Sequence, residues 1–355
     1  MRASPAVSAN ILVGNLSGLA DPKRSSDGGA ISVFEYSDPE IKHNVIVQNR
    51  ALNNNDSGGI FVALWSSPLI EGNLIVGNEG GGLFLGGQEH RYGRTLDPLP
   101  PPEDFLVRVL RNLFVGNEHR GGGPAGQVSG AMRFTMQSRA LLENNIIARN
   151  PGGVHLQRSE LVLRNNTILD DLGIIEKMEG LAPVALVNNI LRGTLTIRTG
   201  VSIAYCNVRG SYRGTGSFDV DPGFVDDGFA ATAVAAKYDE ASFTTGLTSS
   251  RRLRPQALAG RPIQLGESWS VVKDNGTHTL SVWGSLPGEA AMQASFGFSV
   301  PPTYRLGPGS PCIDSGTNLD AAATDCYRTP RPLHGGISKT ADLGAHEHDQ
   351  KREGK

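Results

Sequence analysis

The hexapeptide Asn73-Leu-Ile-Val-Gly-Asn78 is one copy of a phrase that returns along the first two-thirds of the chain. Each full copy begins and ends with Asn and carries mainly apolar residues between the two. The other full copies are residues 10–15, 44–49, 112–117 and 145–150, and shortened copies begin at Asn166, Asn189 and Asn207. Such regular repetition is typical of a solenoid, in which each repeat buries its apolar face against its neighbours.

A second phrase precedes most copies: two or three glycines, or Gly130-Ala131 in one copy, followed by a short alternating stretch. The first apolar residue of that stretch, repeat by repeat, is Ile31, Ile60, Leu83, Met132 and Val154. Short apolar stretches bounded by Gly, Asn, Ser and Pro are typical of strands joined by tight turns. The repeats therefore predict an all-β parallel β-helix whose coils each contain three short strands.

The Asn at a fixed corner has a physical role in such a coil. Identical amides stacked from coil to coil can hydrogen-bond to one another, and Asn tolerates the left-handed backbone of a sharp bend. We therefore expect a structural ladder, rather than a ligand site, at Asn44, Asn73, Asn112 and Asn145.

The repeats resemble the right-handed parallel β-helix repeat proteins of the pectate-lyase-like superfamily, over about residues 4–225. A second resemblance is to the closing segment of bacterial secreted β-helix proteins. It rests on residues 221–226 (DPGFVD), 304–316 (YRLGPGSPCIDSG), Arg331-Pro332 and 341–345 (ADLGA). The resemblance implies a right-handed β-helix in an exported protein.

The chain departs from that pattern by a long insert before Tyr304. Apolar and polar residues alternate there around Asp274-Asn-Gly276, which is a strong hairpin signal. We expect a small β-rich insert with Trp269 and Trp283 in its core. The predicted domains are the parallel β-helix at 1–225, the insert at 226–303, and a C-terminal capping segment and tail at 304–355. The cap is expected over the last coil, because an uncovered coil exposes strand edges.

Composition argues against two kinds of partner. The net charge is −2 and long runs of Lys or Arg are absent, so nucleic acid is not expected. No stretch approaches the roughly 18 apolar residues that a membrane-spanning helix needs. The N-terminus lacks an export signal and reads as the middle of a repeat, so we expect a trimmed extracellular or cell-surface protein. The oligomeric state is left open.

The chain has three cysteines, too few for a disulfide scaffold. Cys206 lies within the repeats and is expected to be a buried thiol. Cys312 and Cys326 lie in a loop-rich segment, and whether they form a disulfide is left open.

Side chains alternate along a strand, so the residue after each inward one faces outward. On the first strand of each coil this rule gives one outward file: Ser32, Phe61, Phe84, Arg133 and His155. The neighbouring file is Phe34, Ala63, Gly86, Thr135 and Gln157. Large exposed aromatic side chains in such a file indicate a bound partner.

A long loop leaves the same face between Gly86 and Asp104, and long loops on a rigid scaffold often carry function. The substrate-binding candidates are Phe61, Phe84, Arg91, Arg94 and Gln157, and the catalytic candidates are Arg133, His155, His90 and Tyr92. Aromatic rings suit sugar faces, Arg suits anionic groups, and His or Tyr suits proton transfer. The competing interpretation is that the loop covers the aromatic file and the charges form a solvated rim.

Metal-binding signals are weak, and no metal site is predicted. Paired acids nevertheless make Ca²⁺ a candidate cofactor, or would serve as the acid and base of a glycoside hydrolase: Asp170 and Asp171, Asp219 and Asp221, and Asp226 and Asp227. His346-Glu-His348 lacks the i, i+4 spacing of a helical metal site and is interpreted as part of a solvated tail.

Three functions follow as expectations. The first is a secreted or cell-surface protein that binds or processes a polysaccharide or other glycan, acidic glycans included, on the face of the first sheet. The second is a polysaccharide lyase, which the resemblance implies would neutralise the sugar carboxylate with a cation or Ca²⁺ while a base removes the C5 proton. The third is a non-catalytic structural or adhesive module. Fold alone does not separate them.

Overall fold

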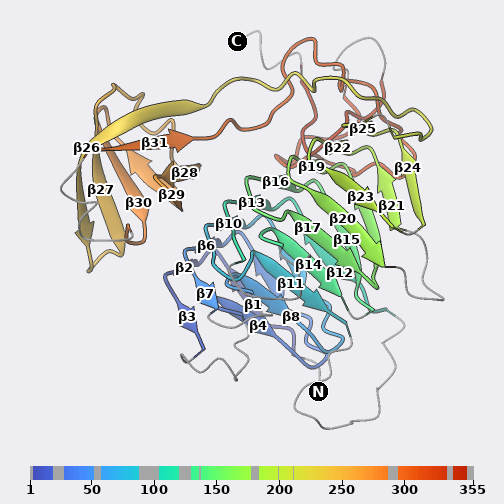
Figure 1. Ribbon diagram of the computed structural model, residues 1–355, viewed down its shortest axis with the longest axis horizontal. Coiled ribbons are helices and arrows are strands. Elements are labelled where there is room, and N and C mark those ends of the chain that lie inside the picture. Colours follow the sequence, from blue (N-terminus) through green and yellow to red (C-terminus); the bar gives the residue numbers. More distant parts are fainter. Residues whose placement is uncertain are drawn as a thin grey trace.

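The computed structural model describes residues 3–18, 28–51, 57–87, 104–119, 129–135, 137–176, 184–198, 200–210, 212–286, 295–333 and 339–349. All of the regular elements in these ranges are β-strands. They form a long stack of parallel strands, a closed barrel beside it, and a C-terminal segment that returns to the stack (Figure 1). No helix in these ranges is long and apolar enough to cross a membrane.

Three parallel sheets make up the stack. The first contains β4 (Ile31–Val33), β8 (Ile60–Val62), β11 (Leu83–Gly86), β14 (Met132–Thr135), β17 (Val154–Gln157), β20 (Leu172–Glu176) and β23 (Leu195–Ile197). The second contains β1 (Ala6–Ser8), β5 (Glu40–Lys42), β9 (Leu69–Glu71), β12 (Val107–Leu110), β15 (Arg139–Glu143), β18 (Glu160–Arg164), β21 (Val184–Val187) and β24 (Val201–Ala204). The third contains β2 (Ile11–Val13), β6 (Val45–Val47), β10 (Leu74–Val76), β13 (Leu113–Val115), β16 (Ile146–Ala148), β19 (Thr167–Ile168), β22 (Ile190–Leu191) and β25 (Asn207–Val208). A short pair joins β3 (Leu16–Ser17) to β7 (Arg50–Ala51).

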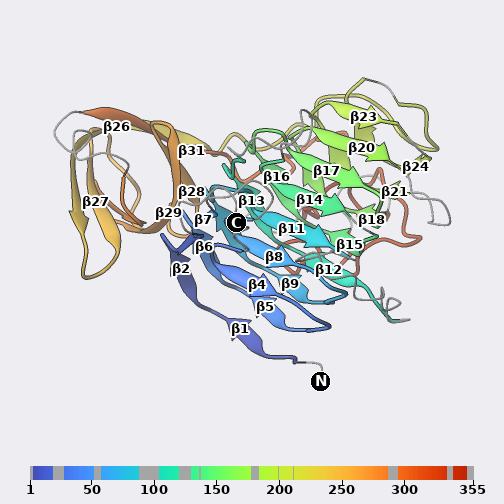
Figure 2. The same cartoon turned by 60° about the horizontal axis from the view of Figure 1, so that its bottom comes forward.

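Each complete coil passes through the first, second and third sheets in turn, and Figure 2 shows the coils stacked from the N-terminal end upward. The predicted inward residues Ile60, Leu83, Met132 and Val154 are at most 2% exposed and belong to one apolar core inside the coils. The architecture is therefore a parallel β-solenoid, as the repeats predicted.

Two columns of Asn side chains run along the solenoid. In the first, Nδ2 of each Asn donates to Oδ1 of the next: Asn44 to Asn73 at 2.9 Å, Asn73 to Asn112 at 2.9 Å and Asn112 to Asn145 at 3.1 Å. The full column runs through Asn10, Asn44, Asn73, Asn112, Asn145, Asn166 and Asn189, and it ends on Cys206 Sγ. The second column, absent from the sequence prediction, runs through Asn15, Asn49, Asn78, Asn117 and Asn150 to Asp170.

The insert forms a closed antiparallel barrel of six strands with its own apolar core. The strands are β26 (Phe229–Asp239), β27 (Thr244–Ser249), β28 (Pro262–Leu265), β29 (Ser268–Asn275), β30 (Thr279–Trp283) and β31 (Phe296–Val300). Strands β29 and β30 form a hairpin closed by a hydrogen bond from Gly276 N to Thr279 O, at the position of the predicted Asn-Gly turn.

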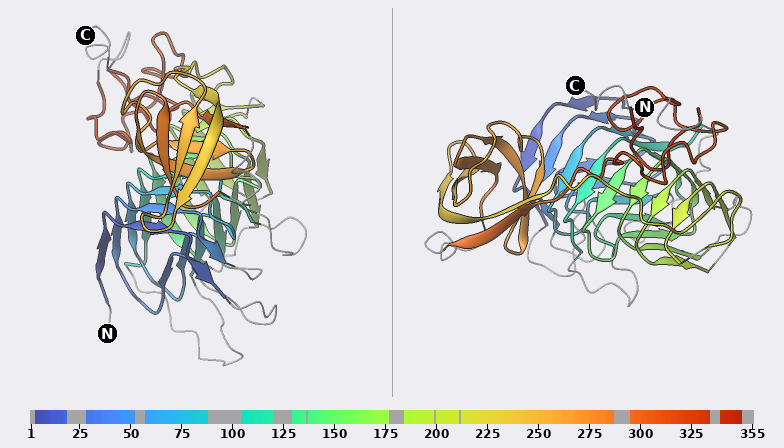
Figure 3. Two further views of the ribbon diagram at one scale, coloured as in Figure 1. Left: turned by 90° about the vertical axis from the view of Figure 1, so that its left-hand side faces the viewer. Right: turned by 90° about the horizontal axis from the view of Figure 1, so that it is seen from above.

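The barrel packs against the outer face of the third sheet at its N-terminal coils (Figure 3). Trp269 is 9% exposed and lies in a cluster with Val47, Val76 and Val115 of the solenoid. Trp283 is half-buried at the same cluster. The prediction that the two Trp residues belong to the core of the insert is therefore wrong in one respect: they bury their rings between the insert and the solenoid.

The C-terminal segment runs along the flank of the solenoid and contacts several coils. The prediction that it covers the last coil alone is therefore wrong. Tyr304 and Ala345 pack on Ile146 and Ala148, and Leu306 and Leu343 pack on Ile190. The physical reason is that the outward positions of the third sheet are apolar in these coils and need a cover.

A third set of Asn side chains holds this segment in place. Asn144, Asn165 and Asn188 each precede a member of the first column and have positive φ, which turns their side chains outward. Their Nδ2 atoms donate to the carbonyl oxygens of Thr324 (2.7 Å), Asp342 (3.1 Å) and Thr317 (2.9 Å) respectively. In each Asn-Asn pair the two residues therefore have different functions. The first bonds to the C-terminal segment outside the corner, and the second belongs to the column inside it.

The three cysteines are free thiols. Cys206 is fully buried, as expected, and burial raises its pKa to about 11. Cys312 is buried too, with its Sγ 3.2 Å from Asn207 Nδ2, and it forms no disulfide with Cys326.

Candidate functional site

The predicted outward file exists on the first sheet as one line of directly paired residues. Ser32 pairs with Phe61, Phe61 with Phe84, Phe84 with Arg133, and Arg133 with His155. The parallel register brings their side chains to one face, because pairing keeps the alternation of neighbouring strands in step.

The aromatic part of this file is buried. Phe61 is 0% and Phe84 6% exposed, and their rings stack with centroids 4.7 Å apart and planes 6° apart. Phe34 packs on Phe61 with centroids 5.2 Å apart. The interpretation that these rings lie exposed is wrong, and the competing interpretation, that the aromatic file is covered, agrees with their burial. The loop expected to cover them lies, over residues 88–103, outside the described residues.

The polar part of the file is a pair of basic side chains. Arg133 is half-buried and its guanidinium lies 5.7 Å from the centre of the Phe84 ring, within cation–π range. His155 is 6% exposed. Burial, with a smaller effect of the Arg133 charge, lowers the pKa of His155, so the imidazole is neutral at pH 7. Its Nε2 atom is buried and has no hydrogen-bond partner among the described residues.

The neighbouring file adds no charged side chain to this face. Gly86 pairs with Thr135, which is 6% exposed, and Gln157 is half-buried where the register between β17 and β20 shifts. The remaining predicted site residues lie outside the described residues: His90, Arg91, Tyr92 and Arg94.

Most of the acids considered for Ca²⁺ bond to the chain itself. Asp219 accepts hydrogen bonds from Arg192 (2.8 Å) and Gly210 N (2.8 Å), and Asp227 accepts from Thr303 N (2.7 Å) and Oγ1 (2.8 Å). Asp170 ends the second Asn column. Within the described ranges, no group of three or more His, Cys, Asp or Glu side chains is arranged to hold a metal ion.

The interpretation of His346-Glu-His348 as a solvated tail is wrong. Glu347 is 1% and His348 2% exposed, because these residues are enclosed by other parts of the C-terminal segment. Glu347 Oε2 lies 3.6 Å from the Arg331 guanidinium, and Glu347 accepts hydrogen bonds from Leu333 N (2.8 Å) and Asp342 N (3.0 Å). Burial raises the pKa of Glu347 to about 7 and that of Asp342 to about 6, and the charge of Asp342 adds to the effect at Glu347.

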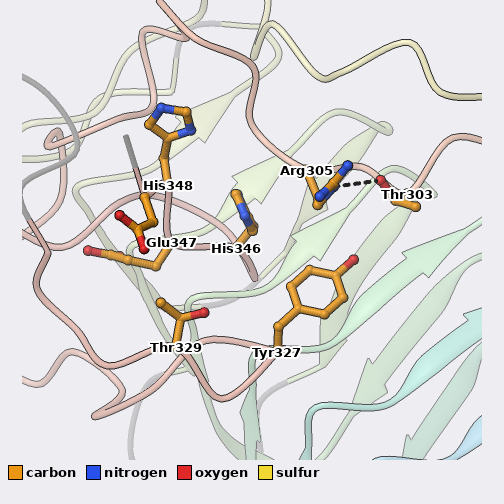
Figure 4. Close-up of a pocket in the computed structure, with 8 residues that line it drawn as sticks. Thr303, Arg305, Tyr327, Thr329, His346, Glu347 and His348 are labelled. Atoms are coloured by element: carbon orange, nitrogen blue, oxygen red, sulfur yellow. Dashed lines mark hydrogen bonds between the residues drawn. The ribbon is translucent and has the colours of Figure 1, made fainter. Parts of the chain in front are cut away.

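A pocket of about 350 Å³, which sequence reasoning missed, lies beside this network (Figure 4). We call it the C-terminal pocket, and it is lined by Thr303, Arg305, Tyr327, Thr329, His346, Glu347, His348 and Asp349. The closing-segment motif contained a signal for its wall. Arg331 of that motif donates to Asp342 O and Gly344 O, both at 2.9 Å, and so fixes the turn that carries the His-Glu-His sequence.

No family model matches the chain, and no curated protein or solved structure does either.

Proposed function

We propose that this protein is a right-handed β-helix of the pectate-lyase-like type that acts outside the cell and binds an acidic polysaccharide on the face of the first sheet. The observation that carries the proposal is the direct pairing of Arg133 with His155 on adjacent strands of that face. A guanidinium suits the carboxylate of an acidic sugar, and a neutral imidazole beside it can donate one further hydrogen bond.

The partnerless Nε2 of His155 supports the same proposal. A buried polar atom without a hydrogen bond lowers stability, typically by about 1–3 kcal/mol, and calls for an explanation. A ligand that reaches this nitrogen would supply the missing bond. Because Phe61 and Phe84 are buried, neither ring is available to stack on a sugar. Their proposed role is to hold Arg133 in place, since its guanidinium lies over the Phe84 ring and Phe84 stacks on Phe61.

The test measures binding of the whole chain to immobilised acidic and neutral polysaccharides. Arg133→Ala is expected to weaken binding to an acidic glycan at least about tenfold. The matched control is Arg108→Ala, which removes an exposed Arg from the second sheet. Equal losses in the two variants, or no binding to any acidic glycan, would overturn the proposal in favour of a structural module.

A lyase is the second candidate, and the pairing of His155 with Arg133 on adjacent strands favours it. A neutral His beside a cation is equipped to remove a proton next to a neutralised carboxylate. Eliminative cleavage would appear as an ultraviolet-absorbing unsaturated product, with and without Ca²⁺, and would be lost in His155→Ala. Binding without that product supports the first proposal alone.

A further inference from the structure

The C-terminal pocket presents hydrogen-bond donors that the fold leaves unused. It lies in the C-terminal segment, outside the first-sheet face, so its function does not depend on the proposal above. Its volume of about 350 Å³ is at the lower end of the range for small-molecule sites.

His346 has a defined donor atom. The backbone N–H of Leu306 donates to His346 Nδ1 at 3.2 Å, so Nδ1 carries no proton. Burial and the charges of Arg305 and Arg331 lower the pKa of His346 to about 3, which keeps the ring neutral. The single ring proton is therefore on Nε2, and this N–H donates to none of the described residues.

Arg305 supplies the positive charge of the pocket. Its Nε donates to Thr303 Oγ1 at 3.3 Å, and its guanidinium lies 3.8 Å from Asp227 Oδ2. These contacts fix one edge of the guanidinium, while 47% of the side chain is exposed. Asp227 only partly offsets the charge, because its carboxylate also lies 3.5 Å from the Arg261 guanidinium.

Tyr327 and Thr329 form a wall with a ring and a hydroxyl group. The backbone N–H groups of both donate to Asp325 Oδ1, at 2.8 and 2.7 Å, which fixes the turn that carries the two side chains. The Tyr327 ring is half exposed and meets the His346 ring edge-on, with centroids 5.9 Å apart. In Figure 4 it extends toward Arg305 and Thr303.

Two acids line the pocket, Glu347 and Asp349, and Glu347 is less available than the donors. Both oxygens of Glu347 accept backbone N–H groups, and one of them also faces Arg331. An anion entering the pocket therefore meets Arg305 and the His346 N–H without an unbalanced carboxylate at Glu347.

We propose that the C-terminal pocket binds a single sugar ring that carries a carboxylate, either free or at the end of a glycan chain. The carboxylate lies between Arg305 and His346 Nε2, the apolar face of the ring packs on Tyr327, and Thr329 Oγ1 bonds a ring hydroxyl. The exposed aromatic ring is the reason for a sugar acid rather than a simple anion, because aromatic faces suit the C–H face of a sugar.

The experiment compares three probes by calorimetry and by NMR of the His346 ring: D-galacturonate, D-galactose and acetate. Galacturonate contains both features, galactose lacks the carboxylate, and acetate lacks the ring. We expect galacturonate to bind at least about tenfold more tightly than either comparison probe. Its carboxylate should also shift the His346 Nε2–H signal. Equal affinity for acetate, or for galactose, would overturn the proposal.

Variants assign the binding to this pocket. Arg305→Gln and Tyr327→Ala should each weaken galacturonate binding at least about tenfold, whereas Arg252→Gln, an exposed Arg on the barrel, should not. Tyr327 is half exposed, so its variant tests the pocket even if Arg305→Gln disturbs the fold. Arg108→Ala, which removes an exposed Arg from the second sheet, should also leave galacturonate binding unchanged. Loss in Arg133→Ala with retention in both pocket variants would place the sugar on the first sheet and overturn this proposal.

Discussion

Asn150 donates from Nδ2 to the carboxylate of Asp170 at 2.7 Å, so the second Asn column ends on an ionisable group. The backbone N–H of Asn150 donates to the same oxygen at 2.9 Å. Burial nevertheless raises the pKa of Asp170 above its ordinary value, because the desolvation of the charged carboxylate outweighs these bonds. The last position of a column of neutral amides thus favours a neutral group.

Replacing Asp170 with Asn should stabilise the protein at neutral pH. Below the unfolded pKa of about 3.9 the wild-type carboxyl is protonated in both states and the variant gains nothing. As the pH rises through the raised folded pKa, the wild type loses stability and the variant does not. Urea unfolding at pH 4 and 7 measures the difference. A control is Asp171→Asn, an exposed neighbour, and the same pH dependence in both variants would contradict the assignment.

Asn112→Ala should destabilise the solenoid far more than Asn10→Ala. Asn112 Oδ1 accepts two hydrogen bonds from Asn73, and Nδ2 donates to Ile70 O and to Asn145. Because all of these groups are buried, the expected loss in the free energy of unfolding is about 2–4 kcal/mol. Asn10 is exposed at the first rung, so its loss should stay below about 1 kcal/mol. Similar losses in urea unfolding would argue against a cooperative column.

Gly116→Ala should loosen the barrel from the solenoid. Gly116 has φ +66°, and an added Cβ would lie 2.2 Å from Trp269 Cγ. Gly14 is a matched control, because it has φ +65° with nothing within 4 Å of an added Cβ. Both variants bear the cost of Ala at positive φ, about 1 kcal/mol, but only Gly116→Ala should change the Trp fluorescence and speed proteolysis between the solenoid and the barrel. Equal effects would indicate backbone strain alone.

Glu347→Gln should make the protein lose less stability than the wild type as the pH rises. The folded pKa values of about 7 for Glu347 and about 6 for Asp342 lie above the unfolded values, so their contribution is complete below about pH 4 and is lost as the pH rises through 6 to 7. Gln stays neutral and can still accept the Leu333 N–H. Thermal unfolding at pH 5 and 8 checks this, with exposed Glu267→Gln as the control. A variant that loses more stability at pH 8 than the wild type would mean that the Arg331 ion pair dominates.

The strands and the first Asn column were predictable because both depend on local spacing. Strand alternation also predicted the line from Phe61 to His155, since parallel pairing transfers one residue's direction to the next coil. Alternation gives the direction of a side chain but not what covers it. It therefore left two interpretations of Phe61 and Phe84, exposed or covered, and the structure shows that both rings are buried. The second column was overlooked although its residues close the same hexapeptides.

The contacts of the barrel and of the C-terminal segment were not predictable from the same patterns. Trp269 reads as a core residue of its own hairpin, and its contact with Val76 joins positions far apart in the chain. The tail residue Glu347 reads as solvated because charged residues usually are, and it is buried only because Arg331 and backbone N–H groups surround it. Such contacts depend on tertiary packing that no local period encodes.

The two Asn columns also restrict the positions at which the chain can gain or lose residues. Successive rungs of the first column are separated by as few as 21 and as many as 39 residues, yet the columns stay five residues apart at every full hexapeptide. Loops between rungs can therefore grow or shrink without cost to either column. A single residue inserted inside a hexapeptide would put both columns out of step at once, so whole coils, or loops outside the corner, are the units in which this solenoid can be lengthened.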